Sequence, residues 1–475
     1  MAVRFLLDGE VIELDAVDPT ATVLDHLRYR MRRTGTKEGC AEGDCGACTV
    51  LVGTLEGEAV AWRAVNACIQ FLPMLNGKAL MTVESLGGGE GGLNALQCAM
   101  AANGSSQCGF CTPGFVMSLH GRTIGARGCD LPVADVIAGN LCRCTGYGPI
   151  IEAGEGAAPC PQDDAPVVAA LKALGRESAS GEWQGRRWFA PRSAEELAAL
   201  LAEHPDARLV AGATDVGLWV TKGLRTLDTV IFLGDVADLG VIEETAGALT
   251  LGAGVRYADA HAAIARLHPE LGELVRRIGG LQVRNAGTVG GNIANGSPIG
   301  DGPPALIALG AELTLRSAAG RRTMPLEDYF VAYGKQDRQP GEFVESVRIP
   351  RPAESAVIHI AKLSRRFDSD ISAVCGAFAL EVDDGTITAA RVAFGGMAAT
   401  PKRAGACEAA LIGKPFSEAT LTRAAEALRE DYQPLSDVRG SSIYRLDAAA
   451  NLLRRLWLRS QGVAVSVLEV EAHDG

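Results

Sequence analysis

Eight cysteines in the first 150 residues fall into two groups of four, and this clustering constrains the fold of the 475-residue chain more than any other feature. Four thiolates are what one [2Fe-2S] cluster needs. Each group therefore predicts one cluster, and two clusters in one chain predict a protein that carries electrons. The two groups are Cys40, Cys45, Cys48, Cys68 and Cys108, Cys111, Cys142, Cys144.

The first group has the plant-type ferredoxin spacing, C-x4-C-x2-C followed by a distant fourth cysteine. Glycines within the loop 39–48 permit close backbone approach, so amide N–H groups can point at the cluster. Upstream, Asp8-Gly9 between two apolar runs predicts a hairpin, and Thr22 predicts the start of a helix over 23–33. Hairpin, helix and cluster loop follow one another in the ferredoxin order.

A zinc ribbon and a disulfide framework are the alternatives at this first group. Structural zinc usually takes two C-x2–4-C knuckles, and only one is present here. The N-terminus has no secretory signal pattern, which disfavours disulfides. The other five cysteines are expected to be buried, unreactive thiols, with Cys160 the most prone to exposure: Cys98, Cys129, Cys160, Cys375 and Cys407.

The second group lies in two loops, 107–114 and 139–147, each supplying two cysteines. The apolar segments 115–120 and 133–137 between them are short enough to be single helices. A small helical bundle could therefore present Cys108 and Cys111 to Cys142 and Cys144.

Length and composition limit the remaining possibilities. A chain of 475 residues with 47% hydrophobic residues predicts several domains of roughly 100–150 residues each. No apolar run reaches the ~20 residues of a membrane span, and a net charge of -12 disfavours nonspecific binding to nucleic acid or anionic lipid. We expect a soluble, cytoplasmic protein with neither a membrane nor a nucleic acid as partner.

Residues 154–184 are rich in Gly, Pro, Asp and Ser and predict a linker, with a short helix at 167–174. Beyond it, a helix at 193–203 and strands at 209–210 and 230–233 alternate with glycine-rich turns, which indicates an α+β unit. Two of these turns, 209–217 and 284–298, have the small residues of a phosphate cradle. On composition alone, each segment could equally be an ordinary turn that binds no phosphate.

The phrases CAEGDCGAC, QCGFCTPG and GNLCRCTGY resemble the iron–sulfur portion of the molybdenum hydroxylases, which include xanthine dehydrogenase, aldehyde oxidoreductase and carbon monoxide dehydrogenase. The two glycine-rich turns are similar to the FAD-binding domain of the same family. The resemblance implies a multidomain α+β fold. Its expected parts are a β-grasp ferredoxin-like domain (1–75), a helical-bundle [2Fe-2S] domain (76–153), the linker (154–184), an α+β FAD-binding domain (185–350) and a C-terminal α+β flavoprotein domain (351–475).

The resemblance also implies which residues contact FAD. Two turns would surround the diphosphate, Asp301 would bond the ribose or another polar part, and Lys362 would contact the cofactor. Ile278 and Val344 match apolar packing positions, with a place in the core as an equal alternative. Arg366, Asp368 and Asp370 form a candidate loop for NAD access. The turn residues are Leu209, Val210, Ala211, Gly212, Ala213, Thr214, Asp215, Val216, Thr288, Val289, Gly290, Gly291 and Asn292.

No stretch after residue 350 is long enough for a molybdopterin domain, so a partner is expected to supply it. The phrases KLSRRFDSDISAVCG and AFGGMA make the chain most similar to small subunits of two-subunit bacterial xanthine dehydrogenases. That similarity implies a molybdenum-pterin cofactor on a large subunit beside Gln107, NAD as acceptor, two small plus two large subunits, and no catalytic residue on this chain.

Two other functions stay open at this point. One is the equivalent subunit of a molybdenum hydroxylase that acts on an aldehyde or another N-heterocycle. The other is a stand-alone iron–sulfur flavoprotein diaphorase that has no molybdenum partner.

Overall fold

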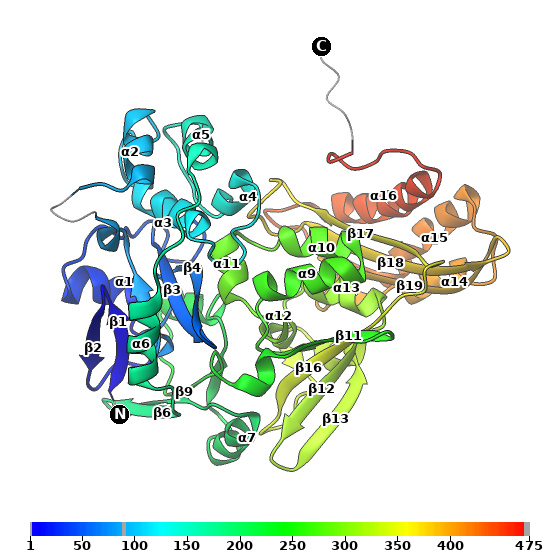
Figure 1. Cartoon of the computed structure of the whole chain (residues 1–475). Coiled ribbons are helices and arrows are strands. Elements are labelled where there is room, and N and C mark those ends of the chain that lie inside the picture. Colours follow the sequence, from blue (N-terminus) through cyan, green and yellow to red (C-terminus); the bar gives the residue numbers. More distant parts are fainter. Residues whose placement is uncertain (1, 88–91, 470–475) are drawn as a thin grey trace. The chain divides into compact units, whose positions relative to one another are not determined.

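The computed structural model describes residues 2–87 and 92–469 (Figure 1). The chain folds into two compact units whose segments interleave along the sequence. Unit 1 comprises Met1–Gly240, Gly254–Ala260 and Ile278–Gly291, and unit 2 comprises Val241–Ala253, His261–Arg277 and Asn292–Gly475. Among the residues described, no helix combines the length and apolarity needed to cross a membrane.

Unit 1 begins with a five-stranded sheet in the order β2-β1-β5-β3-β4, the β-grasp sheet that the sequence predicts. The hairpin turns at Asp8 (φ 54°) and Gly9 (φ 81°), because a tight two-residue turn requires left-handed backbone at both positions. The strands are β1 (Val3–Leu7), β2 (Glu10–Leu14), β3 (Thr49–Glu56), β4 (Ala59–Asn66) and β5 (Ala79–Met81).

The helix predicted over 23–33 starts where expected and ends early. The Thr22 hydroxyl accepts the Asp25 amide (3.0 Å), and helix α1 (Val23–Asp25) continues as a π-helical turn, His26–Arg30. Arg32 then adopts left-handed backbone (φ 58°), which ends the helix before Arg33.

A helical bundle follows, as predicted from the second group of cysteines. Phe115, Met117 and Val136 are fully or almost fully buried in its core. The predicted short helices at 115–120 and 133–137 are confirmed as α3 and α4. The bundle comprises α2 (Ala95–Ala102), α3 (Thr112–Thr123), α4 (Val133–Ile137) and α5 (Gly148–Gly156).

Residues 154–184, predicted as a linker with a short helix at 167–174, contain that helix and also regular structure at both ends. Helix α5 runs to Gly156, helix α6 (Ala165–Leu174) packs on the β-grasp sheet, and strand β6 begins at Ala179. The Trp62 indole donates to the Asp164 carboxylate at 3.0 Å, which fixes the segment before α6. The path of this segment is therefore along the β-grasp sheet.

A four-stranded sheet in the order β6-β7-β9-β8 completes unit 1. Ser193 caps helix α7 (Ala194–Glu203) by accepting the Glu196 amide, so this predicted helix is confirmed. The remaining elements are β6 (Ala179–Trp183), β7 (Arg186–Ala190), β8 (Arg208–Val210), β9 (Thr229–Phe232), α8 (Val216–Thr221) and α11 (Leu281–Ala286). Helices α9 (Tyr257–Leu267) and α12 (Val289–Asn295) cross from one unit to the other.

Unit 2 contains a five-stranded sheet in the order β10-β11-β16-β12-β13. Adjacent strands are antiparallel, and the register of β12 against β16 shifts between Thr314 and Leu315. The strands are β10 (Ile242–Glu244), β11 (Ala248–Gly252), β12 (Glu312–Ser317), β13 (Gly320–Pro325) and β16 (Phe343–Pro350), with a separate pair, β14 (Phe330–Ala332) and β15 (Lys335–Gln336).

A second sheet in unit 2, ordered β17-β18-β19-β20, packs against α14, α15 and α16 around Phe378, Phe394 and Leu453 (Figure 1). The elements are β17 (Val357–Leu363), β18 (Val374–Asp383), β19 (Thr386–Gly395), β20 (Lys402–Arg403), α10 (Pro269–Arg276), α13 (Gly302–Ala308), α14 (Gly405–Leu411), α15 (Glu418–Asp431) and α16 (Ser442–Ser460).

Glu270 joins three elements of unit 2. Its carboxylate accepts the Ile360 amide of β17 (2.6 Å), lies 3.0 Å from His359 Nδ1 and pairs with Arg459 of α16 (2.8 Å). Burial by itself raises the pKa of Glu270, but the contacts with His359, Ile360 and Arg459 outweigh it and leave that pKa below its ordinary value. The ionised carboxylate therefore stabilises the folded state.

We expect Glu270→Gln to lower the free energy of unfolding by about 3 kcal/mol near neutral pH, because a partly buried ion pair is broken. The stabilisation is present above the unfolded pKa of about 4.3 and is lost as pH falls through the lower folded pKa. The gap between the thermal midpoints of wild type and variant should therefore close in acid.

Glu273→Gln is the matched control on the same helix, since Glu273 pairs with Arg276 at a more exposed position. Such a pair contributes under ~1 kcal/mol. A gap for Glu270→Gln that stays constant from neutral to acid pH would contradict the assignment.

Candidate iron–sulfur and flavin sites

The first cysteine group surrounds a loop whose backbone amides face sulfur. The amides of Glu42 and Asp44 each lie 3.4 Å from Cys40 Sγ, and that of Cys45 lies 3.3 Å from it. Left-handed backbone at Gly43 (φ 78°) allows the loop to turn back on itself. Amides directed at sulfur are suited to stabilising the negative charge of thiolates that bind iron.

The four thiols of this group converge. Cys40 is within hydrogen-bonding reach of Cys45 and Cys68, and Cys68 also reaches Cys48. Hydrogen bonds from Cys45 and Cys68 hold the pKa of the Cys40 thiol far below its ordinary value, and contacts with Cys40 and Cys48 raise the pKa of Cys68. Because Cys48 and Cys68 are both only 2% exposed, this is a buried site.

The second group also comes together, in two pairs. The Cys111 thiol contacts Cys142, and Cys108 contacts Cys144. Burial, followed by the contact with Cys142, raises the pKa of Cys111 to about 12. The Tyr147 hydroxyl accepts the Cys142 amide at 3.0 Å and so holds the second loop. Whereas Cys48 and Cys68 of the first group are buried, Cys108 and Cys144 of the second group are exposed.

Both sites have the donor set that a [2Fe-2S] cluster requires, four thiolates on short loops. Across residues 2–87 and 92–469, no three or more His, Cys, Asp or Glu side chains are arranged to hold a single metal ion. All thirteen cysteines are free thiols in the structure.

A direct hydrogen bond connects the two groups. The amide of Leu141, which precedes Cys142, donates to the carbonyl of Cys45 at 2.9 Å. A Cβ atom at Gly46 would collide with the carbonyl of Gly139, so the two loops meet at backbone distance. A ligand of one predicted cluster is therefore one hydrogen bond and one residue away from a ligand of the other.

A buried side-chain network holds this contact in place. Gln282 Nε2 lies 2.9 Å from Asn140 Oδ1 and 3.1 Å from the hydroxyls of both Thr49 and Ser118. Asn140 in turn donates to the Gly46 carbonyl at 3.1 Å. All four side chains are at most 2% exposed. Asn140 and Gln282 were not predicted, because a polar residue carries no sequence signal of the distant partners it will meet.

The first glycine-rich turn, 209–217, joins β8 to α8. Ala213 adopts left-handed backbone (φ 59°), and Gln70 donates to the Gly212 carbonyl at 3.1 Å. A Cβ atom at Gly212 would collide with the carbonyl of Ala286, which ends α11. This turn is therefore pressed against the start of the second turn.

The segment 284–298, predicted as a second turn, is mostly helical, since it contains the end of α11 and all of α12. The turn itself is the link between these two helices. Thr288 Oγ1 accepts the Gly291 amide at 3.0 Å, and a Cβ atom at Gly287 would lie 3.4 Å from Thr214 Oγ1. The structure thus brings the two turns together in unit 1, where small residues leave backbone accessible to a diphosphate. Ile278 is half-buried beside α11, and Val344 is buried in β16 of unit 2.

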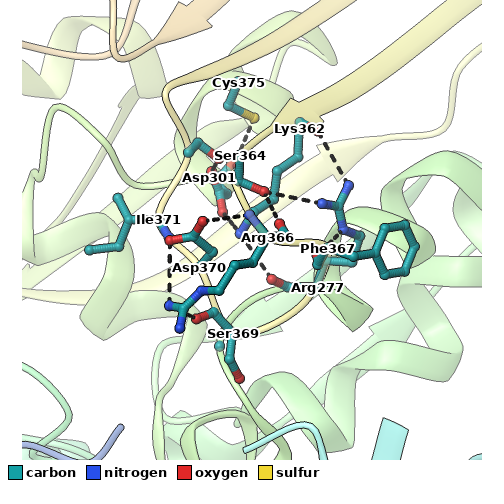
Figure 2. Close-up of polar contacts among 12 residues, drawn as sticks. Arg277, Asp301, Lys362, Ser364, Arg366, Phe367, Ser369, Asp370, Ile371 and Cys375 are labelled. Carbon is teal, nitrogen blue, oxygen red and sulfur yellow. Dashed lines mark hydrogen bonds and ion pairs between the residues drawn. The ribbon is translucent and has the colours of Figure 1, made fainter. Parts of the chain in front are cut away.

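Two predicted cofactor residues of unit 2 bind each other (Figure 2). Lys362 Nζ lies 2.7 Å from Asp301 Oδ2 and donates to the Arg277 carbonyl at 2.9 Å. Ser372 donates to the other oxygen of Asp301. The side chains of Lys362 and Asp301 are 2% and 9% exposed, so this is a buried, neutralised ion pair. The sequence did not predict this pairing.

The predicted NAD-access loop is ordered by its own backbone and by Arg277 (Figure 2). Arg277 donates to the Phe367 carbonyl at 2.9 Å, and its guanidinium lies 4.5 Å from the Phe367 ring centre. Burial raises the pKa of Asp370, but amides including that of Arg366 (2.9 Å) outweigh it and leave the pKa below its ordinary value. Asp368 lies 3.8 Å from Arg276.

The remaining cysteines differ from prediction at two positions. Cys129, Cys375 and Cys407 are buried, as expected, whereas Cys160, named as the most prone to exposure, and Cys98 are exposed. The prediction that Cys98 is buried is wrong. It lies on α2, whose buried face is formed by Leu96 and Met100, and therefore points away from the core.

Four family models match the chain in sequence order. They describe a 2Fe-2S iron-sulfur cluster binding domain (residues 5–72), a [2Fe-2S] binding domain (82–155), an FAD binding domain in molybdopterin dehydrogenase (181–352) and a CO dehydrogenase flavoprotein C-terminal domain (359–460). The chain therefore has two [2Fe-2S] domains and an FAD-binding domain.

Comparison with solved structures decides the family. A chain of carbon monoxide dehydrogenase from Hydrogenophaga pseudoflava is 31% identical, with a TM-score of 0.54, and the match covers 94% of that chain and 56% of this one. Quinoline 2-oxidoreductase from Pseudomonas putida 86 is 30% identical with a TM-score of 0.53, covering 97% and 58%.

The chain belongs to the molybdenum hydroxylases. It has the architecture of their iron–sulfur and flavin subunits, which confirms the predicted fold class. Xanthine dehydrogenase from Emericella nidulans is 30% identical over 96% of this chain. The chain spans only 38% of the length of that relative.

We expect Cys68→Ala to remove one cluster, because it deletes one of four converging thiolates at a buried site. Iron should fall from about four to about two atoms per chain, and one of two EPR signals of the reduced protein should disappear. Iron analysis and EPR of the purified variant test this.

Cys129→Ala is the control, since Cys129 is also buried (3% exposed) but lies outside both groups. It should keep both signals. Full iron content in Cys68→Ala would show that Cys68 is not a ligand.

Proposed function

We propose that this chain is the electron-transfer subunit of a xanthine dehydrogenase. It would carry electrons from a molybdenum site on a partner subunit, through two [2Fe-2S] clusters and FAD, to NAD. The observation that carries this proposal is the convergence, within unit 1, of both cysteine groups and both glycine-rich turns.

The chemistry requires this set of cofactors. Hydroxylation of a purine carbon by water releases two electrons and two protons, and reduction of NAD⁺ consumes two electrons and one proton. Iron–sulfur clusters transfer single electrons whereas a flavin exchanges either one electron or a hydride, so a flavin is needed between the clusters and NAD. The chain would therefore bind and position these groups, and we place no acid, base or nucleophile for the purine on it.

The chain's own residues have distinct proposed roles. The eight cysteines of the two groups would hold the clusters, and the Leu141 amide would connect them through Cys45. Residues 209–216 and 288–292 would contact the FAD diphosphate. Asp301 and Lys362, neutralised by each other, would place a polar pair at the cofactor, with Ile278 and Val344 as apolar neighbours.

A surface for the molybdenum partner is proposed at the second cysteine group. Cys108, Cys144 and Gln107 are exposed there, and so are two large apolar side chains, Phe110 (48%) and Leu141 (39%). Exposed apolar side chains beside a cluster site fit a protein interface better than a free surface. Because the chain spans only 38% of the xanthine dehydrogenase relative, we propose that a separate large subunit binds the molybdopterin. We further propose an assembly of two small and two large subunits.

Xanthine is the favoured substrate because the xanthine dehydrogenase relative aligns with 96% of the chain, clusters and flavin part together. The carbon monoxide dehydrogenase and quinoline oxidoreductase chains align with 56% and 58% of this chain but are themselves covered to 94% and 97%, so their lower coverage reflects shorter chains and not a different substrate. These two chains are as similar to this one in sequence, at 31% and 30% identity, as the xanthine dehydrogenase is at 30%. The second candidate function is therefore the same electron-transfer role in a molybdenum hydroxylase with another substrate.

We expect Gly212→Ala to reduce the flavin content of the purified chain several-fold, because its Cβ atom would displace the Ala286 carbonyl and separate the two turns. Iron content should stay unchanged. Gly240→Ala is the control, since a Cβ atom there meets no atom within 4 Å. Normal FAD content in Gly212→Ala would exclude the turn contact as a flavin determinant.

Purification of the tagged chain from its native host tests the proposal as a whole. We expect a molybdenum-containing polypeptide to co-purify, and xanthine to reduce NAD⁺, followed by absorbance at 340 nm. Activity with an aldehyde or N-heterocycle instead would select the second candidate. If no molybdenum-containing polypeptide co-purifies and the chain oxidises NADH with an artificial acceptor, the protein is a diaphorase.

A further inference from the structure

Unit 1 contains a cavity with polar and apolar walls that no cysteine of either group lines, although Ala211 and Gly212 of the first glycine-rich turn form part of it. It has a volume of about 50 Å³ and lies beneath the first glycine-rich turn, lined by β3, β4, Lys78 and Asp235. A site needs roughly 10–15 Å³ of such space to hold one water molecule, so there is room for a small ion with water.

Positive charge predominates at the cavity wall. Arg63, Lys78 and Arg256 line it, against the single carboxylate of Asp235. Lys78 and Arg63 side chains are 7% and 6% exposed, so bulk water screens them little. Around Asp235, three cations share one carboxylate: Lys78 at 3.4 Å, Arg176 at 2.6 Å and Arg192 at 3.5 Å.

Neighbouring carboxylates reduce this excess without removing it. Asp259 accepts from Arg63 at 2.9 Å and lies 3.8 Å from Arg256, and Glu56 lies 3.3 Å from Arg63 but also pairs with exposed Arg127. Glu196 faces Arg192. Six cationic side chains thus meet four carboxylates: Arg63, Lys78, Arg127, Arg176, Arg192 and Arg256 against Glu56, Glu196, Asp235 and Asp259.

Two further observations indicate a missing negative partner. Arg63 Nε is buried and has no hydrogen-bond partner among the described residues. The pKa of Lys78 lies below its ordinary value because burial disfavours its charge more than Asp235 restores it. Buried cations without full compensation are strongly destabilising.

We propose that this cavity binds one small inorganic anion of the size of chloride. The anion would lie among Arg63, Lys78 and Arg256 and neutralise the excess charge between the β-grasp sheet and the first glycine-rich turn. A water molecule accompanying it would donate to Asn285 Oδ1, a buried acceptor at the wall that is also unpaired. The site would serve stability, and it shares Ala211 and Gly212 with the turn that is proposed above to contact FAD.

The test measures the thermal midpoint of the full chain with its cofactors at constant ionic strength, while bromide replaces gluconate, an anion too large for the cavity. We expect a saturable rise of about 2–4 °C. In crystals grown with bromide, an anomalous peak should lie in the cavity.

Lys78→Met distinguishes a specific site from general salt effects. It removes one cation while leaving Asp235 paired with Arg176, so the variant should fold, lose the bromide response and be at least as stable as wild type in gluconate. Lys172→Met, at an exposed lysine of the same unit paired with Glu58, should keep the response. A bromide response that is linear, or the same in Lys78→Met, would overturn the proposal, as would a cavity containing only water.

Discussion

The hydrogen bonds of Gln282 are the interaction on which the arrangement of unit 1 depends. One buried amide reaches the strand after the first cysteine loop, the helix after Cys111 and the loop before Cys142, through Thr49, Ser118 and Asn140. Losing the partners of a buried amide nitrogen is costly, so the three contacts of Gln282 Nε2 favour one relative position of the three segments, although Gln282 Oε1 has no partner among the described residues. Gln282 itself lies in α11, directly before the second glycine-rich turn.

This dependence connects cofactor sites that lie far apart in the sequence. Electron transfer needs fixed distances between centres, and here the cysteine loops meet at backbone distance, at Gly46 and Gly139. The glycine-rich turns meet in the same way at Gly212 and Ala286. A side chain at Gly46 or Gly212 would collide with the facing backbone. Glycine is therefore required at these positions by the close approach of two segments, and not only by the flexibility of a turn.

The sequence allowed the local parts to be predicted, because their signals are short-range. The Asp8-Gly9 hairpin, the Thr22 cap and the spacing of Cys40, Cys45 and Cys48 each depend on residues within one or two turns of chain. The early end of the first helix depends on left-handed Arg32, a conformation that no residue type at that position signals. The Asp301–Lys362 pair and the exposure of Cys98 depend on tertiary packing and could not be predicted locally.

The central claim is that one chain positions two [2Fe-2S] clusters and one FAD. Its most direct test is the quantification of iron, acid-labile sulfide, zinc and FAD per purified wild-type chain, together with EPR of the reduced protein. We predict about four irons, about four sulfides, about one FAD and two distinct [2Fe-2S] signals. A single signal with about two irons, zinc in place of iron, or a chain that retains no flavin would contradict the account.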